Sequence, residues 1–336
     1  MGATTGPAAT TDWPLPIGKP AAAHWWSIQR PPPSEPISAR RAYGEVLGVF
    51  AAFFAVGILA GAETLTHRYQ PPSGSWAVFG PATISELATA SLAVLVTVLL
   101  SARRGISARS LGFGLPKNSR GGAAVWPAFR IGIWALMALV VGGAITGLLA
   151  TGKLGQPVRQ DYSYQLYATA ASLAAGIVEE TVVLAFVVTT LRQARRPLLE
   201  IVIVAVLLRC SYHDYYGPGV VGIAIWAAVF AWLFLRSGSV IPLIVVHFIW
   251  DATIFWSQRW HWVNTLRVLG ALALVIVAIV SWLADVSKRY DANRPRYGGR
   301  SSATYTAWPF SLSQQPQQPK LPREHSSPRD PGQLHR

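Results

Sequence analysis

The stretch that decides the fold is residues 165–191, QLYATAASLAAGIVEETVVLAFVVTTL. At about 1.5 Å per residue, a helix of this length can cross the ~30 Å hydrocarbon core of a bilayer. Two adjacent acidic residues, Glu179 and Glu180, lie well inside this apolar run. An ionisable side chain near the centre of a lone transmembrane helix costs roughly 2.5–3.5 kcal/mol. The stretch therefore predicts a membrane-spanning helix whose carboxylates face a protein interior, where they find partners or take part in chemistry.

The composition of the whole chain also indicates an integral membrane protein. Of the 336 residues, 51% are hydrophobic and 13% are charged, and the charged share is about half that of a typical soluble domain. These values argue against a soluble enzyme, a disordered chain and a disulfide-rich secreted module. The single cysteine, Cys210, allows no intramolecular disulfide. The net charge of +14 is better explained by cytoplasmic loops and tails, where Lys and Arg accumulate, than by binding to nucleic acid.

Recurring apolar runs predict an all-α, polytopic transmembrane bundle of about eight helices. The predicted spans are 45–62, 84–101, 131–151, 165–191, 198–213, 219–236, 239–256 and 267–285. The fifth is short and ends in SYHDYYGPG, so it is expected either to span the bilayer or to be re-entrant. The Gly-Pro-Gly of this segment must end a helix, and its tyrosines are interpreted as interfacial aromatics. Basic residues alternate between successive loops, which predicts that both termini are cytoplasmic.

The two ends of the chain differ from its middle. Residues 1–42 carry eight prolines, and residues 286–336 are rich in Ser, Gln, Pro and Arg. Neither end can bury enough apolar surface to fold, so both are predicted to be disordered tails. They flank a transmembrane helical domain over residues 43–285. The expected partners are membrane lipids, which attract the basic residues near the bilayer, and not nucleic acid.

Three of the predicted helices carry ionisable side chains. Glu179 and Glu180 lie well inside the fourth span, and His247 and Asp251 lie inside the seventh. Arg209, His213 and Asp214 lie toward the end of the fifth. His247 and Asp251 are four residues apart, so they share one helical face. Glu179 and Glu180 are ~100° apart on a helix, so one is expected to face a cavity while the other braces it. A single such residue is often an ordinary core residue, whereas the whole set predicts one common site.

This set of side chains supports hydrolysis of a peptide bond in the membrane. A carboxylate beside a bound water can take its proton, and the resulting hydroxide attacks a carbonyl. Imidazoles can hold the water, a metal or the developing oxyanion. His213, His247 and Asp251 are a reasonable ligand set for a divalent metal such as zinc, although the HExxH signature is absent. A metal-free site, with a Glu base and histidine donors, is equally compatible with these residues.

The ordered motifs resemble the CPBP family, the prokaryotic relatives of the CAAX-processing endopeptidases, also called the Abi or bacteriocin-immunity family. Its members carry EExxxR, then FxxxH, then HxxxN or HxxxD on successive core helices. Glu179 and Glu180 match the first motif and His213 matches the second. His247 and Asp251 match the third. The resemblance covers about residues 165–256 and extends loosely to the rest of the chain.

The resemblance implies an intramembrane endopeptidase and assigns a role to each matched residue. Glu179 is the first choice to activate water, and Glu180 would position it. His213 and His247 would bind a metal or stabilise the oxyanion, with Asp251 as a further ligand or oxyanion partner. The substrate would be a membrane-associated peptide or protein, such as a pheromone precursor or a bacteriocin-linked protein. The location would be a prokaryotic cell membrane.

Two positions depart from the family pattern. Leu184 stands where the first motif has arginine, and Arg209 stands where the second has phenylalanine. Arg209 lies one turn before His213, so we expect it to reach the glutamate pair from another helix and to supply the missing cation. Counted along the predicted spans, His213 lies somewhat farther out in the bilayer than Glu179 and His247.

Two other functional classes stay open at the level of the sequence. An ion- or proton-coupled transporter also keeps carboxylates and histidines at mid-membrane, although the chain shows no repeated halves. A catalytically inactive membrane scaffold is the other class, and the leucine at position 184 is its best support.

Overall fold

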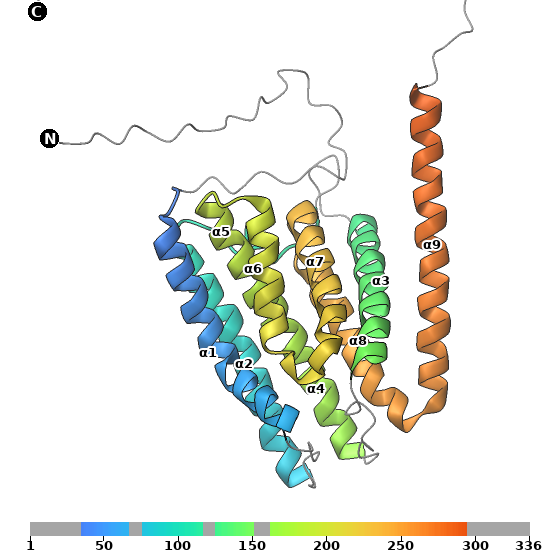
Figure 1. Cartoon of the computed structure of the whole chain (residues 1–336), viewed down its shortest axis with the longest axis horizontal. Coiled ribbons are helices and arrows are strands. Elements are labelled where there is room, and N and C mark those ends of the chain that lie inside the picture. Colours follow the sequence, from blue (N-terminus) through green and yellow to red (C-terminus); the bar gives the residue numbers. More distant parts are fainter. Residues whose placement is uncertain (1–34, 67–75, 117–124, 151–161, 294–336) are drawn as a thin grey trace, which may run out of the picture. The chain divides into compact units, whose positions relative to one another are not determined.

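The computed structural model describes residues 35–66, 76–116, 125–150 and 162–293, and these residues contain helices but no strand. Most of the two predicted tails lies outside them. The helices are α1 (Ala39–Thr66), α2 (Trp76–Ala102), α3 (Val125–Leu149), α4 (Tyr162–Glu179), the π-helix η1 (Glu180–Val188), α5 (Thr189–Gln193), α6 (Leu198–Ser211), the 3₁₀-helix η2 (Asp214–Gly219), α7 (Val220–Ser237), α8 (Ile241–Arg259) and α9 (His261–Asn293) (Figure 1). The predicted all-α class is confirmed.

Seven helical segments of the described chain are long and apolar enough to cross a membrane. One of them, Tyr162–Gln193, joins α4, η1 and α5 into a single span. Each of the eight predicted spans contains a helix, but α6 has only 14 residues. At 1.5 Å per residue it is about 21 Å long, less than the ~30 Å of the hydrocarbon core. The described residues therefore contain seven long spans, with α6 as a shorter helix between α5 and α7.

The helical part of the chain is longer than predicted at both ends. It begins at Ala39 and continues to Asn293, whereas the sequence predicted a helical domain over 43–285. By its contacts the chain divides into two compact units, Met1–Val286 and Ser287–Arg336. All the residues of the predicted site belong to the first unit.

The two faces of α6 show why this short helix enters the protein. Leu199, Ile203 and Leu207 are exposed, which suits contact with lipid. The opposite face carries Ile201, Ala205 and Arg209, also spaced by four residues and buried. The helix packs against η1 and α7. Its period of about 3.6 residues per turn therefore places the charged Arg209 inside the protein and apolar side chains outside.

Close helix contacts at glycine bring the polar segments together. A Cβ added at Gly176 of α4 would lie 3.2 Å from the carbonyl oxygen of Ile244 and 3.3 Å from the amide nitrogen of Phe248, both in α8. The missing side chain thus lets α4 approach the backbone of α8. Small residues commonly permit such contacts between membrane helices. Because Gly176 lies one turn before the glutamate pair, this contact sets the distance between the pair and α8.

Candidate active site

The glutamate pair lies at the junction between two kinds of helix. Glu179 is the last residue of α4, and Glu180 is the first residue of the π-helix η1. A π-helix forms i→i+5 hydrogen bonds, and such segments occur frequently at functional sites. All nine residues of η1 are buried. The Glu180 side chain is fully buried, whereas the Glu179 side chain keeps 12% of its surface exposed.

One guanidinium from α6 binds both carboxylates. Arg209 donates from Nη1 to Oε2 of Glu179 at 2.7 Å and from Nη2 to Oε2 of Glu180 at 2.8 Å. Its side chain is 1% exposed, and its guanidinium lies 4.6 Å from the ring centroid of Trp226. Both glutamates thus face the same cation, although they are adjacent in sequence. Leu184, where the family motif has arginine, is an apolar core residue, and the cation that binds both carboxylates is Arg209.

His247 connects the glutamates to Asp251. Its Nδ1 lies 2.7 Å from Oε1 of Glu180. Its Nε2 lies 3.3 Å from Oδ2 of Asp251 and 3.9 Å from Oε2 of Glu179. Ionised carboxylates only accept hydrogen bonds, so the imidazolium, with a proton on each nitrogen, is the form of His247 that satisfies both sides.

His213 lies beside this cluster in a defined tautomer. Its Nδ1 is 2.9 Å from the carbonyl oxygen of Arg209. A carbonyl oxygen only accepts, so Nδ1 carries a proton, and when the ring is neutral its Nε2 presents a lone pair. The ring stacks on Tyr216 and meets the Trp226 indole edge-on, with centroids 6.3 Å apart. The same indole contacts the His247 ring at 5.5 Å, so Trp226 joins the two histidines.

The depth of His213 in the bundle agrees with that of the glutamates. The depths of Glu179 and His213 can be compared by counting residues from the short turn 194–197, which joins α5 to α6. Glu179 lies 14 residues before the end of α5 at Gln193, and His213 lies 15 residues after the start of α6 at Leu198. The neighbouring Tyr212 bonds directly to Glu179. The outward displacement expected for His213 is therefore absent.

Two residues of the site were not identified from the sequence. Tyr212, interpreted as an interfacial aromatic, donates its hydroxyl to Oε2 of Glu179 at 3.0 Å and stacks on Phe54 of α1, with ring centroids 4.3 Å apart. Its position three residues after Arg209, on the same helical face, was the available signal. Trp226 lies in an apolar run of α7, and nothing in its local sequence distinguishes it from a packing residue.

The donor atoms do not fit a metal ion in this arrangement. His247 directs both nitrogens at carboxylates, and Arg209 already binds the two glutamates. Within the described residues, no group of three or more His, Cys, Asp and Glu side chains is placed to hold one metal ion. The predicted ligands His213, His247 and Asp251 are thus near one another but are not assembled as a coordination shell.

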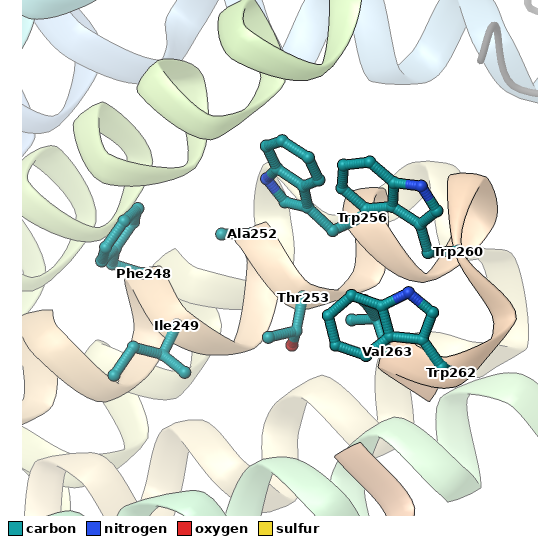
Figure 2. A pocket seen from close by; sticks show the side chains of 8 residues that line it. All are labelled: Phe248, Ile249, Ala252, Thr253, Trp256, Trp260, Trp262 and Val263. Carbon is teal, nitrogen blue, oxygen red and sulfur yellow. The ribbon is translucent and has the colours of Figure 1, made fainter. Parts of the chain in front are cut away.

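An apolar pocket lies on α8 beside the face that carries His247 and Asp251. Its volume is about 330 Å³. It is lined by Phe248, Ile249, Ala252, Thr253, Trp256, Trp260, Trp262 and Val263 (Figure 2). Figure 2 shows the three indoles gathered at one end and Phe248 and Ile249 at the other. Because Phe248 and Ala252 each follow a site residue by one position, the pocket is ~100° around the helix from the carboxylate cluster.

The polar cluster lies in a segment of the chain that matches the model of a known protein family. Residues 162–253 match the family model described as Type II CAAX prenyl endopeptidase Rce1-like. This segment is similar to the Rce1-like family. The predicted relation to the CAAX proteases is confirmed, and the family implies peptidase activity in a membrane protein. No curated protein and no solved structure matches the chain. The Rce1-like segment runs from α4 to the middle of α8 and contains every predicted site residue.

Proposed function

We propose that this protein is an intramembrane endopeptidase in which Glu179 is the general base. The observation that carries the proposal is the difference between the two carboxylates bound to Arg209. Glu180 is fully buried, and its two oxygens are bonded to Arg209 and His247. Glu179 keeps 12% exposure, and its partners Arg209 and Tyr212 both bind Oε2. Within the described structure its Oε1 makes no hydrogen bond, so this oxygen is available to a water molecule.

The geometry supports a stepwise role for each residue. Oε1 of Glu179 takes a proton from water, and the hydroxide attacks the carbonyl carbon of the scissile peptide bond. Glu179 then delivers this proton to the nitrogen of the leaving amine as the carbon–nitrogen bond breaks. Arg209 and Tyr212 hold Oε2 and so fix the orientation of the carboxylate. Glu180 fixes Nδ1 of His247 at 2.7 Å.

The histidines supply complementary groups for the tetrahedral intermediate. The imidazolium of His247 is a positive charge close to Glu179, and its contact with Asp251 at 3.3 Å is longer than its contact with Glu180. Nε2 of His247 is therefore the donor that can turn to the oxyanion. Nε2 of His213 presents a lone pair, so it can accept the second proton of the attacking water in a hydrogen bond. Asp251 orients His247 before substrate binds.

We propose a substrate with an apolar chain near the scissile bond. The pocket of about 330 Å³ beside His247 and Asp251 is lined almost entirely by aromatic and aliphatic side chains. Such a pocket suits a lipid chain or a large apolar side chain. The prenyl group in the description of the Rce1-like family has this chemistry. The engagement of His247 by two carboxylates also supports an activity that needs no bound metal.

A cleavage assay in proteoliposomes tests the proposal. The substrate is a fluorescence-quenched peptide with a C-terminal CAAX sequence, offered with and without a farnesyl group on its cysteine. Wild type is compared with Glu179→Gln, and Glu86→Gln serves as the matched control because Glu86 is a carboxylate within α2 (Trp76–Ala102) and outside the site. We expect cleavage by wild type and Glu86→Gln, and a loss of at least ~100-fold in Glu179→Gln. Proton or ion flux without cleavage in the same vesicles would instead identify a transporter.

A further inference from the structure

A second row of buried polar side chains lies on the other side of η1 from the site. On α2 the row consists of Thr97 and Ser101, followed by Arg104 just after the helix. Thr97 and Ser101 are fully buried, and the Arg104 side chain is 2% exposed. The spacings of four and three residues place these side chains on one helical face. The other residues of α2 over 92–102 are apolar.

The contacts of Arg104 show which face of the long α4–η1–α5 span this row meets. Its guanidinium donates to Ser101 Oγ at 3.2 Å and to Thr190 Oγ1 at 3.0 Å. It also lies 5.2 Å from the ring centroid of Phe186. Because η1 forms i→i+5 hydrogen bonds, Thr181 lies on the same face as Phe186, one turn earlier. Thr181 thus lies on the side of η1 that carries Phe186, and η1 packs against α2. On α2, Thr97 lies two turns before Arg104.

The hydroxyls of Thr97 and Thr181 are buried, and neither has a hydrogen-bond partner among the described residues. Another buried hydroxyl of the same long span bonds to its own backbone. Ser172, which is 2% exposed, donates to the carbonyl oxygen of Ala168 at 2.7 Å. A buried hydroxyl without a partner is costly, and buried water is the usual partner where polar groups converge. Thr97 and Thr181 therefore have the two features of an internal water site: unpaired donors and facing helices.

We propose that Thr97 and Thr181 bind a shared internal water between α2 and η1. The water bridges the two hydroxyls and continues the polar row that begins at Arg104 and Glu45, whose carboxylate lies 3.2 Å from the guanidinium. Since Thr181 directly follows Glu180, this bridge ties the first turn of the π-helix to α2. It supports the backbone that presents the glutamate pair, and it does not depend on the proposed peptidase activity.

Radiolytic hydroxyl labelling of the full chain in detergent tests this site without any substrate. Side chains next to bound water are oxidised, so we expect labelling of 180–186 in wild type to exceed that of the buried segment 233–235 of α7. Thr97→Val and Thr181→Val should each reduce this labelling several-fold. The control is Ser172→Ala, which removes a buried hydroxyl that is internally bonded and should leave the labelling of 180–186 unchanged.

Thermal unfolding of the same variants gives an independent measure. If one water serves both hydroxyls, either Val substitution releases it, so the double variant should unfold at nearly the temperature of the more affected single variant. Thr97→Ser and Thr181→Ser, which keep the hydroxyl, should retain the labelling. Equal low labelling of both segments in wild type would overturn the proposal, and so would additive effects of the two Val substitutions.

Discussion

Replacing Arg209 with phenylalanine removes the cation that holds the glutamate pair and installs the residue of the family pattern. The variant leaves the partly buried Glu179 and the buried Glu180 without their charge-assisted hydrogen bonds of 2.7 and 2.8 Å. Removing one partner of a buried ion pair costs about 3–5 kcal/mol. The lost cation–π contact with Trp226 contributes up to about 2 kcal/mol when desolvated, but a phenylalanine ring recovers part of it by packing on the indole. We therefore expect the free energy of unfolding to fall by about 3–5 kcal/mol, together with loss of cleavage.

The assay is unfolding in mixed micelles, followed by tryptophan fluorescence, with cleavage measured on the same preparation. Arg267→Phe is the matched control, because Arg267 also lies 4.6 Å from an indole centroid, that of Trp250, but has no carboxylate partner in the described part of the chain. The double variant Leu184→Arg/Arg209→Phe restores the family arrangement, and we expect it to recover more than half of the lost stability. An Arg209→Phe protein with unchanged stability and unchanged cleavage would refute the role given to Arg209.

Three further predictions concern the base, the pocket and the metal. Tyr212→Phe keeps the stack on Phe54 but removes the hydrogen bond to Glu179. A hydrogen bond to a charged acceptor contributes about 1.5–3 kcal/mol, so its loss should lower kcat about 10–100-fold. A fall in stability with unchanged kcat would contradict a positioning role for Tyr212. Ile249→Trp fills the apolar pocket from its exposed rim and should raise KM for an apolar-tailed substrate about tenfold, whereas Ile203→Trp, on the similarly exposed face of α6, should leave KM unchanged. Prolonged treatment with a chelator should preserve cleavage; activity that is lost with EDTA and returns with zinc would show that the donors rearrange to bind a metal.

Much of the fold could be predicted because the membrane imposes a simple rule on the sequence. Apolar runs long enough to cross the hydrocarbon core become helices, since backbone groups have no other partners there. The short α6 marks the limit of this rule, because a helix that is partly surrounded by protein need not match the thickness of the bilayer. Its alternating buried and exposed residues, seen at Ile201 and Leu199, can be recognised in the sequence only when the neighbouring helices are known.

The site residues could be identified from the sequence for a different reason. Glu179, Glu180, His247 and Asp251 are costly inside a membrane, so their presence indicated a common site. The π-helix was not predictable, because apolar periodicity in an all-apolar segment does not distinguish i→i+4 from i→i+5 hydrogen bonding. Without knowing that the π-helix begins at Glu180, one could not derive that both glutamates contact Arg209. Ring contacts such as Trp226 with Arg209 depend on rotamers, and they have no signature in the chain.

The central claim is that Glu179 activates water for peptide hydrolysis, and mass spectrometry of the cleaved peptide in H₂¹⁸O tests it most directly. Wild-type protein in proteoliposomes should release a product whose new C-terminal carboxylate carries one ¹⁸O atom. Glu179→Gln, folded as judged by its unfolding transition, should release at least ~100-fold less of it. Equal product from wild type and Glu179→Gln, or no product from wild type with any apolar-tailed peptide, would contradict the account.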